Sequence, residues 1–363
     1  MARIVAVEAF PVDVPLTKPF MMSNVRMTAS PNVLVKVTDD EGRSGWGEGV
    51  SSLPVTGESQ GRILATIETL KDRLIGRDPL DRTGAWLALQ KHVKGNRTGI
   101  GALDIALHDL AGKILGVSVA TLIGGRAMDR TPVIALFGSG DPAADVETYR
   151  ARYEDGHRWF KLKVGISAPA VEAETLAQVA AAGHGDIVLA ADANGAWDEH
   201  TAATFIRMIA DLPVRFFEQP VDDRGAFMRL VRSSPVALCA DEHADSLDAV
   251  LGYVGTGLAG VSLKLVKLGG ISGVMRGAAI CRASGMAINL AGKIAETSIA
   301  AAANLHCAAA IGELDYGCSP ANQLIARDVT AAPLTVESGS MRIPDGPGLG
   351  VEVDEELVRS MAP

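Results

Sequence analysis

The sequence lacks the features that mark membrane proteins and nucleic-acid-binding proteins. No stretch approaches the roughly 18 uninterrupted apolar residues that a membrane helix needs, and Glu8 and Pro11 interrupt the N-terminal apolar run too early for a signal peptide. The 34 Lys and Arg residues are outnumbered by 43 Asp and Glu, and a net charge of −9 argues against nucleic acid or an anionic membrane as partner. We therefore expect a cytoplasmic protein without such partners.

Cysteine and aromatic residues are also scarce. The four cysteines contain no CxxC pair, which is typical of reduced, buried thiols rather than of a disulfide framework. Aromatic residues make up only 4% of the chain, so Ala, Leu, Ile and Val must supply most of the core.

The first 125 residues combine strand and helix patterns. Residues 3–16 and 32–49 are rich in β-formers, and the "DDEG" inside the second run predicts a hairpin turn. Residues 61–76 and 97–116 show the apolar spacing of helices. These patterns predict an α+β unit over residues 1–125.

Short β-like runs then alternate with Ala-rich helical patterns. The runs cover residues 133–140, 159–165, 186–195, 215–221, 236–243, 261–270, 287–293 and 311–317. Their regular spacing predicts a (β/α) barrel over residues 126–325, with an open doubly wound sheet as the alternative. No GxGxxG follows the first strand, which weakens the dinucleotide-binding form of that sheet. We expect residues 326–363 to pack back on the N-terminal unit.

Charged residues recur where these strands end. They are Lys161, Lys163, Asp192, Glu218, Asp241, Glu242, Lys264, Lys267, Lys293, Glu313 and Asp315. One such residue alone is usually a helix cap or a solvated side chain. Their repetition on successive strands instead indicates an active site, because the carboxyl ends of parallel barrel strands meet at one face.

The run "WFKLKVG" (159–165) places two lysines in an apolar strand. By the period of two, Lys161 and Lys163 face the barrel interior, while Phe160, Leu162 and Val164 face the helices. Mutual repulsion and burial should both lower the pKa of these lysines. We expect Lys163 to act as a base and Lys161 to tune it.

Asp192, Glu218 and Asp241 come from three consecutive strands and should converge. An all-oxygen set suits a hard cation, Mg²⁺ first and Mn²⁺ next. A small-molecule carboxylate bound there would lose its α-proton to give an enediolate that the metal stabilises. Lys264 should face inward across the barrel from Lys163, so that lysines address both faces of the substrate.

Five motifs in order resemble the enolase superfamily, and specifically its muconate lactonizing enzyme subgroup. They are "KLK" (161–163), "DANGAW" (192–197), "FEQPV" (217–221), "ADEH" (240–243) and "SLKLVKLGG" (262–270). The resemblance implies a modified (β/α)7β barrel with an N-terminal α+β capping domain completed by the C-terminal segment. It also implies lid loops near residues 18–26 and 51–60, and assembly as a dimer or octamer. Strand seven has no histidine, unlike mandelate racemase relatives.

The resemblance also implies roles for individual residues. Asp192, Glu218 and Asp241 would bind the metal, Lys163 and Lys264 would be the acid/base pair assisted by Lys161, and Asn194 would support Asp192 or Lys163. Lys293 departs from the family pattern, in which many relatives have a small residue or cysteine, and it could bind a second anionic group of the substrate or only pair with Glu296. Met21 and Met22 would line the lid.

Glu313 and Asp315 resemble the Asp-x-Asp of dipeptide epimerases, where these acids hold a substrate ammonium group; a solvated loop acid is the alternative for Asp315. Together with the opposed lysines, they favour racemisation or epimerisation of an amino acid derivative or dipeptide. The alternative is a muconate-type cycloisomerase, or a dehydratase or o-succinylbenzoate-synthase-like lyase, acting through the same enediolate.

Overall fold

An antiparallel sheet begins the chain. The computed structural model describes residues 2–22, 25–183 and 185–362, and the side chains of residues 20–26 lie outside that description. The sheet order is β1 (Ile4–Met22), β2 (Val25–Asp39), β3 (Ser44–Val50). The predicted "DDEG" turn joins β2 to β3, with Gly42 at a φ of 80° that favours glycine.

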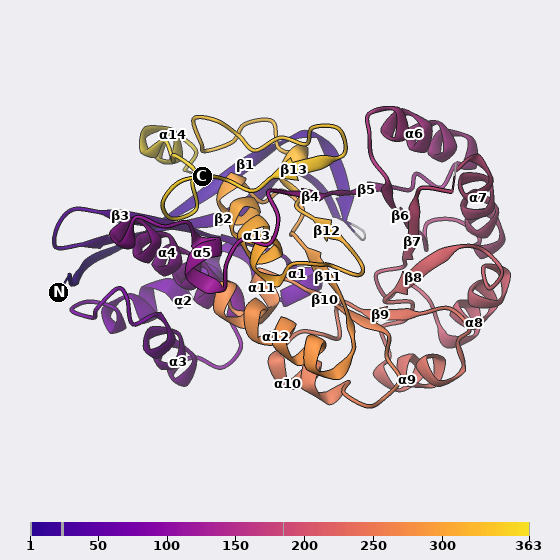
Figure 1. The fold of residues 1–363 in the computed structure, drawn as a ribbon, viewed down its shortest axis with the longest axis horizontal. Coiled ribbons are helices and arrows are strands. Elements are labelled where there is room, and N and C mark those ends of the chain that lie inside the picture. Colours follow the sequence, from indigo (N-terminus) through magenta and orange to yellow (C-terminus); the bar gives the residue numbers. More distant parts are fainter. Residues whose placement is uncertain (1, 23–24, 184, 363) are drawn as a thin grey trace.

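Helices cover this sheet at one end of the molecule (Figure 1). They are α2 (Gln60–Leu70), the 3₁₀ turn η1 (Lys71–Arg73), α3 (Arg82–His92), α4 (Arg97–Leu115) and α5 (Val119–Ile123). The short helix α1 (Leu53–Thr56) precedes them and lies near the middle of the view. α4 lies directly against β3, where a Cβ on Gly45 or Gly47 would come within 2.2 Å of a carbonyl oxygen of the helix. Glycine at these two positions therefore allows the close approach.

Eight parallel strands form the barrel. They are β5 (Ile134–Phe137), β6 (Trp159–Lys163), β7 (Val188–Asp192), β8 (Val214–Glu218), β9 (Leu238–Ala240), β10 (Gly260–Leu263), β11 (Ala287–Ala291) and β12 (Cys318–Ser319). Their spatial order follows the chain, and a bridge between Val133 and Cys318 brings the first and last strands together. The predicted barrel with a capping domain is confirmed, and the doubly wound alternative, whose strand order reverses, is excluded.

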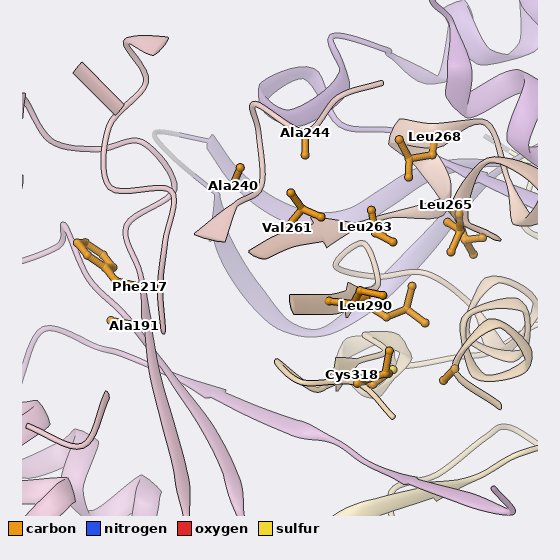
Figure 2. Close-up of a cluster of buried hydrophobic side chains, with 14 of the residues drawn as sticks. Ala191, Phe217, Ala240, Ala244, Val261, Leu263, Leu265, Leu268, Leu290 and Cys318 are labelled. Atoms are coloured by element: carbon orange, nitrogen blue, oxygen red, sulfur yellow. The ribbon is translucent and has the colours of Figure 1, made fainter. Parts of the chain in front are cut away.

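Helices surround the barrel. They are α6 (Pro142–Glu154), α7 (Pro169–Ala182), α8 (Glu199–Met208), α9 (Arg224–Ser233), α10 (Leu247–Gly252), α11 (Leu265–Leu268), α12 (Ile271–Ser284) and α13 (Ser298–Ile311). The outward-facing strand residues are apolar and pack beneath them: Figure 2 shows Val261 and Leu263 of β10 beside Leu290 of β11 and Cys318 of β12. With one face of each strand buried in this way, the other face supplies the barrel interior.

The predicted eighth strand was wrong in position. α13 continues to Ile311 and ends at Gly312, whose φ is 84°. Residues 312–317 form the loop before β12, with Gly317 at a φ of 79°. This loop is therefore at the amino end of the barrel strands, where Tyr316 N–H donates to Ile288 O.

The C-terminal segment contacts both parts of the chain. β13 (Ser340–Arg342) pairs with β4 (Arg130–Pro132), and α14 (Glu355–Ser360) lies by β1. Glu355 forms an ion pair of 2.6 Å with Lys36. The domain boundaries proposed from the sequence stay predictions. Within the described ranges, no helix is long and apolar enough to cross a membrane.

Candidate active site

The two lysines of β6 point into the barrel. Phe160 and Leu162 are each 1% exposed and belong to the core beneath the helices. Lys161 is 3% exposed and donates to Glu218 on β8, and Lys163 donates to Asp192 on β7 over 2.5 Å. The alternation of β6 thus separates its apolar side chains from its charged ones.

The three acids at the ends of β7, β8 and β9 each meet a lysine. Asp192 and Glu218 are register partners on adjacent strands, and Asp241 follows β9. Lys264, the residue after β10, donates to Asp241 over 2.5 Å. β6 and β10 are four strands apart in an eight-stranded barrel, so Lys163 and Lys264 lie on opposite sides of this group.

These ion pairs reverse the expected pKa shift of the buried lysines. Burial acts to lower the pKa of Lys161, but the charges of Glu218 and Asp192 raise it more, and the net shift is upward. Burial likewise acts against Lys264, whose pKa is nevertheless raised by Asp241, Glu242 and Glu218. The expectation of a lowered pKa at Lys161 was therefore wrong, because the carboxylates outweigh burial and the neighbouring ammonium group.

The acids themselves shift in different directions. Burial acts to raise the pKa of Asp241, but Lys264 and Lys267 hold it well below its usual range. Glu218 has a raised pKa, caused first by burial and supported by the charges of Asp192 and Asp241, despite Lys161. Asp192 and Glu218 are register partners and Asp241 follows the next strand, so the three acids lie at the same end of the barrel.

Two more side chains fix these acids in place. Lys267, 2% exposed, donates to Asp241 Oδ1 over 2.6 Å and also to the backbone oxygens of Asp241 and Ser262. Ser262 Oγ donates to Glu218 Oε1 over 2.5 Å. Sequence reasoning noticed Lys267 but gave it no role; its spacing of three from Lys264 was the available signal.

Gln219 connects the ends of β8 and β9. Its side-chain oxygen accepts from Asp241 N–H and His243 N–H, and its amide donates to Val221 O. Gln219 is completely buried with a φ of 36°, a conformation that these hydrogen bonds maintain. The residue stands in the "FEQPV" motif, yet its function could not be inferred without its partners.

Asn194 contacts both of the residues that it was predicted to support. Its Oδ1 accepts from Lys163 over 2.7 Å, and its backbone N–H donates to Asp192 Oδ1. Its Nδ2 donates to Glu242 Oε1 over 3.1 Å. Burial and the charges of Asp241 and Asp192 raise the pKa of Glu242 to about 7. Glu242 thus belongs to the same electrostatic group, although the sequence gave no reason to choose it over Asp241.

Lys293 also lies at this end of the barrel. It follows β11, is 5% exposed, and exchanges backbone contacts with Glu296: Lys293 N–H donates to Glu296 Oε2, and Glu296 N–H to Lys293 O. Burial, then the charges of Lys264 and Lys163, lower the pKa of Lys293 to about 7.

Glu313 and Asp315 lie elsewhere, contrary to expectation. Asp315 accepts from Ile288 N–H at the start of β11 and pairs with Arg282 at 3.6 Å, while the backbone oxygen of Glu313 also contacts Arg282. Both acids precede β12 and so belong to the amino end of the strands, opposite Asp192 and Asp241. Met21 and Met22 cannot be placed, because their side chains lie outside the described residues.

The donor chemistry of the three acids fits a hard divalent cation, since all the side-chain donors are carboxylate oxygens. Asp192, Glu218 and Asp241 are each bound to a lysine. Within the described ranges, no three Asp, Glu, His or Cys side chains are spaced to ligate an ion directly. A cation at the carboxylates would take over charge that the ammonium groups now neutralise.

Comparisons with known proteins agree with this geometry. Residues 4–124 match the family model "Mandelate racemase / muconate lactonizing enzyme, N-terminal domain", and residues 144–357 match "Enolase C-terminal domain-like". The chain is 33% identical to chloromuconate cycloisomerase CbnB of Cupriavidus necator, over 98% of each chain.

Two solved structures are similar over nearly the whole chain. Muconate lactonizing enzyme of Pseudomonas fluorescens, complexed with muconolactone, has a TM-score of 0.93 and 28% identity, covering 99% of each chain. N-succinyl Arg/Lys racemase of Bacillus cereus has a TM-score of 0.92 and 27% identity, covering 99% of this chain and 98% of that one. One architecture thus carries both a lactonizing enzyme and a racemase.

Proposed function

The chain belongs to the mandelate racemase/muconate lactonizing enzyme family of the enolase superfamily, and on that premise we propose that it is a Mg²⁺-dependent cycloisomerase that interconverts a muconate-type dicarboxylate and its lactone. The chain is an isomerase of that superfamily. Enolase-superfamily enzymes generally use a divalent metal, and Mg²⁺, with Mn²⁺ second, is our proposal for the ion.

The comparisons favour the alternative reading of the sequence over the preferred one. Curated relatives at 31–33% identity over nearly the full length are muconate or chloromuconate cycloisomerases. The sequence argument for an amine-bearing substrate depended on Asp315, which lies at the amino end of the strands. Without that acid, no residue at the end of β12 argues for an ammonium group on the substrate.

One structural observation supports proton transfer at the α-carbon: Lys163 and Lys264 stand on opposite sides of three carboxylates. The relatives favour lactonization over racemisation as the reaction in which this transfer takes part. Asp192, Glu218 and Asp241 would hold the cation, which would stabilise negative charge on a bound substrate carboxylate. In lactone formation, one carboxylate of the substrate attacks the carbon β to the other carboxylate. A carbon–oxygen bond forms, and the carbon–carbon π bond breaks and leaves its electron pair toward the α-carbon. A lysine ammonium then delivers one proton to the carbon α to the other carboxylate.

The remaining residues keep the two lysines in position. Asn194 holds Lys163, and Lys267 fixes Asp241 so that Lys264 can reach the substrate. Lys161 stays charged beside Glu218 and offers a further contact to the substrate carboxylate. We further propose a homo-oligomer without nucleic-acid or membrane partners.

The test is turnover of cis,cis-muconate and chloromuconates with Mg²⁺, followed by loss of diene absorbance and by NMR of the product in D₂O. We expect one deuterium at the α-carbon of the lactone, no turnover with excess chelator, and recovery on adding Mg²⁺ back. Lys163→Ala and Lys264→Ala should each lower kcat by about 10²-fold or more. A folded, Mg²⁺-loaded wild-type enzyme inert toward all these compounds would refute the cycloisomerase proposal.

Racemisation is the second candidate, because opposed lysines suit removal and return of a proton on opposite faces. The similarity to an N-succinyl amino acid racemase supports it. Incubation of N-succinyl-L-amino acids in D₂O distinguishes the two functions. Deuterium at Cα with growth of the opposite enantiomer, and no reaction of muconates, would favour the racemase.

A further inference from the structure

We propose that Asn289 and Ser262 form a directed hydrogen-bond chain that orients the Glu218 carboxylate for a divalent cation, with Ser262 as a positioning residue. This inference rests on the proposed function, in which Asp192, Glu218 and Asp241 hold that cation. It assigns a role to two polar side chains inside the barrel, on strands that supply no predicted metal ligand.

Both polar residues face the barrel interior. Val261 and Leu263 of β10 pack outward beneath the helices (Figure 2), so Ser262 between them points inward. Asn289 is the register partner of Ser262 on β11, and both residues are 0% exposed. Glu218 is 1% exposed, so the hydrogen bonds among these three side chains do not compete with bulk water.

The Glu218 carboxylate determines the direction of each hydrogen bond. Lys161 donates to its Oε2, and Ser262 Oγ lies 2.5 Å from its Oε1. An ionised carboxylate can only accept, so the single hydroxyl proton of Ser262 must go to Glu218. Ser262 Oγ must therefore accept from Asn289, whose Nδ2 lies 2.8 Å away. The chain thus runs from Asn289 through Ser262 to Glu218.

The Cys239 thiol completes the surroundings of the Ser262 hydroxyl. Cys239 is the register partner of Glu218 on β9, and its Sγ lies 3.5 Å from Ser262 Oγ. Because Ser262 already donates its only proton to Glu218, the thiol must be the donor in this contact. Ser262 then accepts from two neighbours and donates to one, so its hydroxyl is held in one orientation.

Asn289 leaves its own side-chain oxygen unsatisfied in this arrangement. Its Oδ1 is buried, and no atom in the described part of the chain forms a hydrogen bond with it. If the amide were turned over, Oδ1 could accept the Ser262 proton, but Glu218 would then lose that donor. A buried carbonyl oxygen without a donor destabilises a fold. The arrangement therefore satisfies Glu218 rather than Asn289, as is typical of residues that serve a functional site.

This chain acts on the side of Glu218 that Lys161 does not contact. Ser262 binds Oε1 and Lys161 binds Oε2, so both carboxylate oxygens have a donor within the protein. Hydrogen bonds of this kind orient the ligands of a metal ion. A carboxylate that is oriented before the cation arrives loses less conformational freedom on binding, so the cation binds more tightly.

The experiment measures binding of Mg²⁺ alone, by calorimetric titration without substrate. Ser262→Ala removes the proton donated to Glu218, and we expect the Kd for Mg²⁺ to rise by about 10- to 100-fold. Ser272→Ala is the matched control, because the Ser272 hydroxyl donates over 2.7 Å to another buried carboxylate, that of Asp104, between α12 and α4. The control should bind Mg²⁺ within about threefold of wild type, since distant sites act independently. Equal Kd values for Ser262→Ala and wild type would overturn the inference.

A double-mutant cycle distinguishes a directed chain from a general loss of packing. Asn289→Leu removes the donor that orients the Ser262 hydroxyl and should raise the Kd for Mg²⁺ by about three- to tenfold. In the Ser262→Ala background the same change should have no further effect, because the chain no longer reaches Glu218. Additive losses, or an unchanged Kd in Asn289→Leu, would mean that the two residues only fill space. Circular dichroism and Tm verify folding, and if Ser262→Ala does not fold, the Kd of Asn289→Leu decides alone.

The outcome is separable from that of the proposed function. Wild type that binds Mg²⁺ and shows the expected losses in both variants, but leaves muconates unchanged, would refute the cycloisomerase and keep the chain. Turnover of muconates, with Ser262→Ala binding Mg²⁺ as tightly as wild type, would refute the chain and keep the cycloisomerase. Wild type that fails to bind Mg²⁺ would refute both.

Discussion

At the residue scale, Lys264 and Lys267 show how two lysines bound to one carboxylate can differ. Lys267 donates to three acceptors, two of them backbone oxygens, and its side chain is 1% exposed. Lys264 has Asp241 as its hydrogen-bonded acid, and its side chain is 11% exposed. Lys267 is therefore part of the framework, and Lys264 is the lysine available to a substrate.

Replacing each lysine with methionine tests this division. Lys267→Met removes the lysine donor from Asp241 Oδ1 and one donor from each of the backbone oxygens of Asp241 and Ser262, so we expect the free energy of unfolding to fall by about 3 kcal/mol. Lys264→Met leaves Asp241 paired with Lys267, so unfolding should change by less than about 1 kcal/mol while kcat falls at least about 10²-fold. Urea unfolding followed by circular dichroism, together with turnover, checks both. Equal destabilisation by the two variants would contradict the division.

At the scale of elements, β3 of the capping sheet holds the start of α13 in the barrel. Glu48 on β3 accepts from the backbone N–H groups of Thr297 and Ala300, from the Thr297 hydroxyl and from Asn32. Such a carboxylate satisfies N–H groups that have no partner within the helix. α13 begins just after the Lys293 loop, so the capping domain helps to fix the wall of the site.

Glu48→Gln should weaken this contact. The glutamine amide places an N–H₂ group where both carboxylate oxygens accept hydrogen bonds, so we expect a loss of about 1–3 kcal/mol in unfolding free energy. Hydrogen exchange should accelerate at residues 297–300, at the first turn of α13. Glu68→Gln, which changes an exposed glutamate of α2 paired with Lys71, is the control and should exchange like wild type. Unchanged protection at 297–300 in Glu48→Gln would argue that the cap is dispensable.

At the scale of the whole molecule, the repeated pattern of strands and strand-end charges predicted the fold. Contacts between residues far apart in the sequence could not be predicted in this way. Alternation in β6 and the recurrence of charge on successive strand ends located Lys163, Asp192 and Lys264. The loop 312–317 was assigned as a strand because its apolar residues imitate one, and only Gly312 marked the helix end. The pKa direction of Lys161 depends on carboxylates from other strands, and Glu48 meets Thr297 249 positions later. The closed barrel brings such distant residues together, so their contacts follow from the folded structure and not from a local sequence pattern.

His306 connects three segments of this closed structure, and its protonation allows their packing to be tested by changing the pH. On α13, its Nδ1 accepts from Ala120 N–H of α5 at 3.3 Å, and its Nε2 therefore carries the proton donated to Leu349 O in the C-terminal segment at 3.0 Å. Burial lowers the pKa of His306 to about 4 from its usual 6.5, although the Leu349 contact opposes the shift. The neutral ring satisfies both contacts. A proton on Nδ1 would instead place one donor against another, because the Ala120 N–H points at the same atom.

The stability that this histidine contributes is complete above pH 6.5 and is lost as pH falls toward 4, because only the unfolded chain binds the proton in that window. The loss should reach about 3 kcal/mol, from about 1.4 kcal/mol per pKa unit. His306→Gln can accept and donate in the same places but does not titrate, so its deficit relative to wild type should shrink on acidification. Urea unfolding between pH 4 and 6.5 measures this, with His200→Gln at an exposed position on α8 as control. If the free energy of unfolding of His306→Gln changes with pH in parallel with that of wild type, protonation of His306 does not weaken the contacts between these segments.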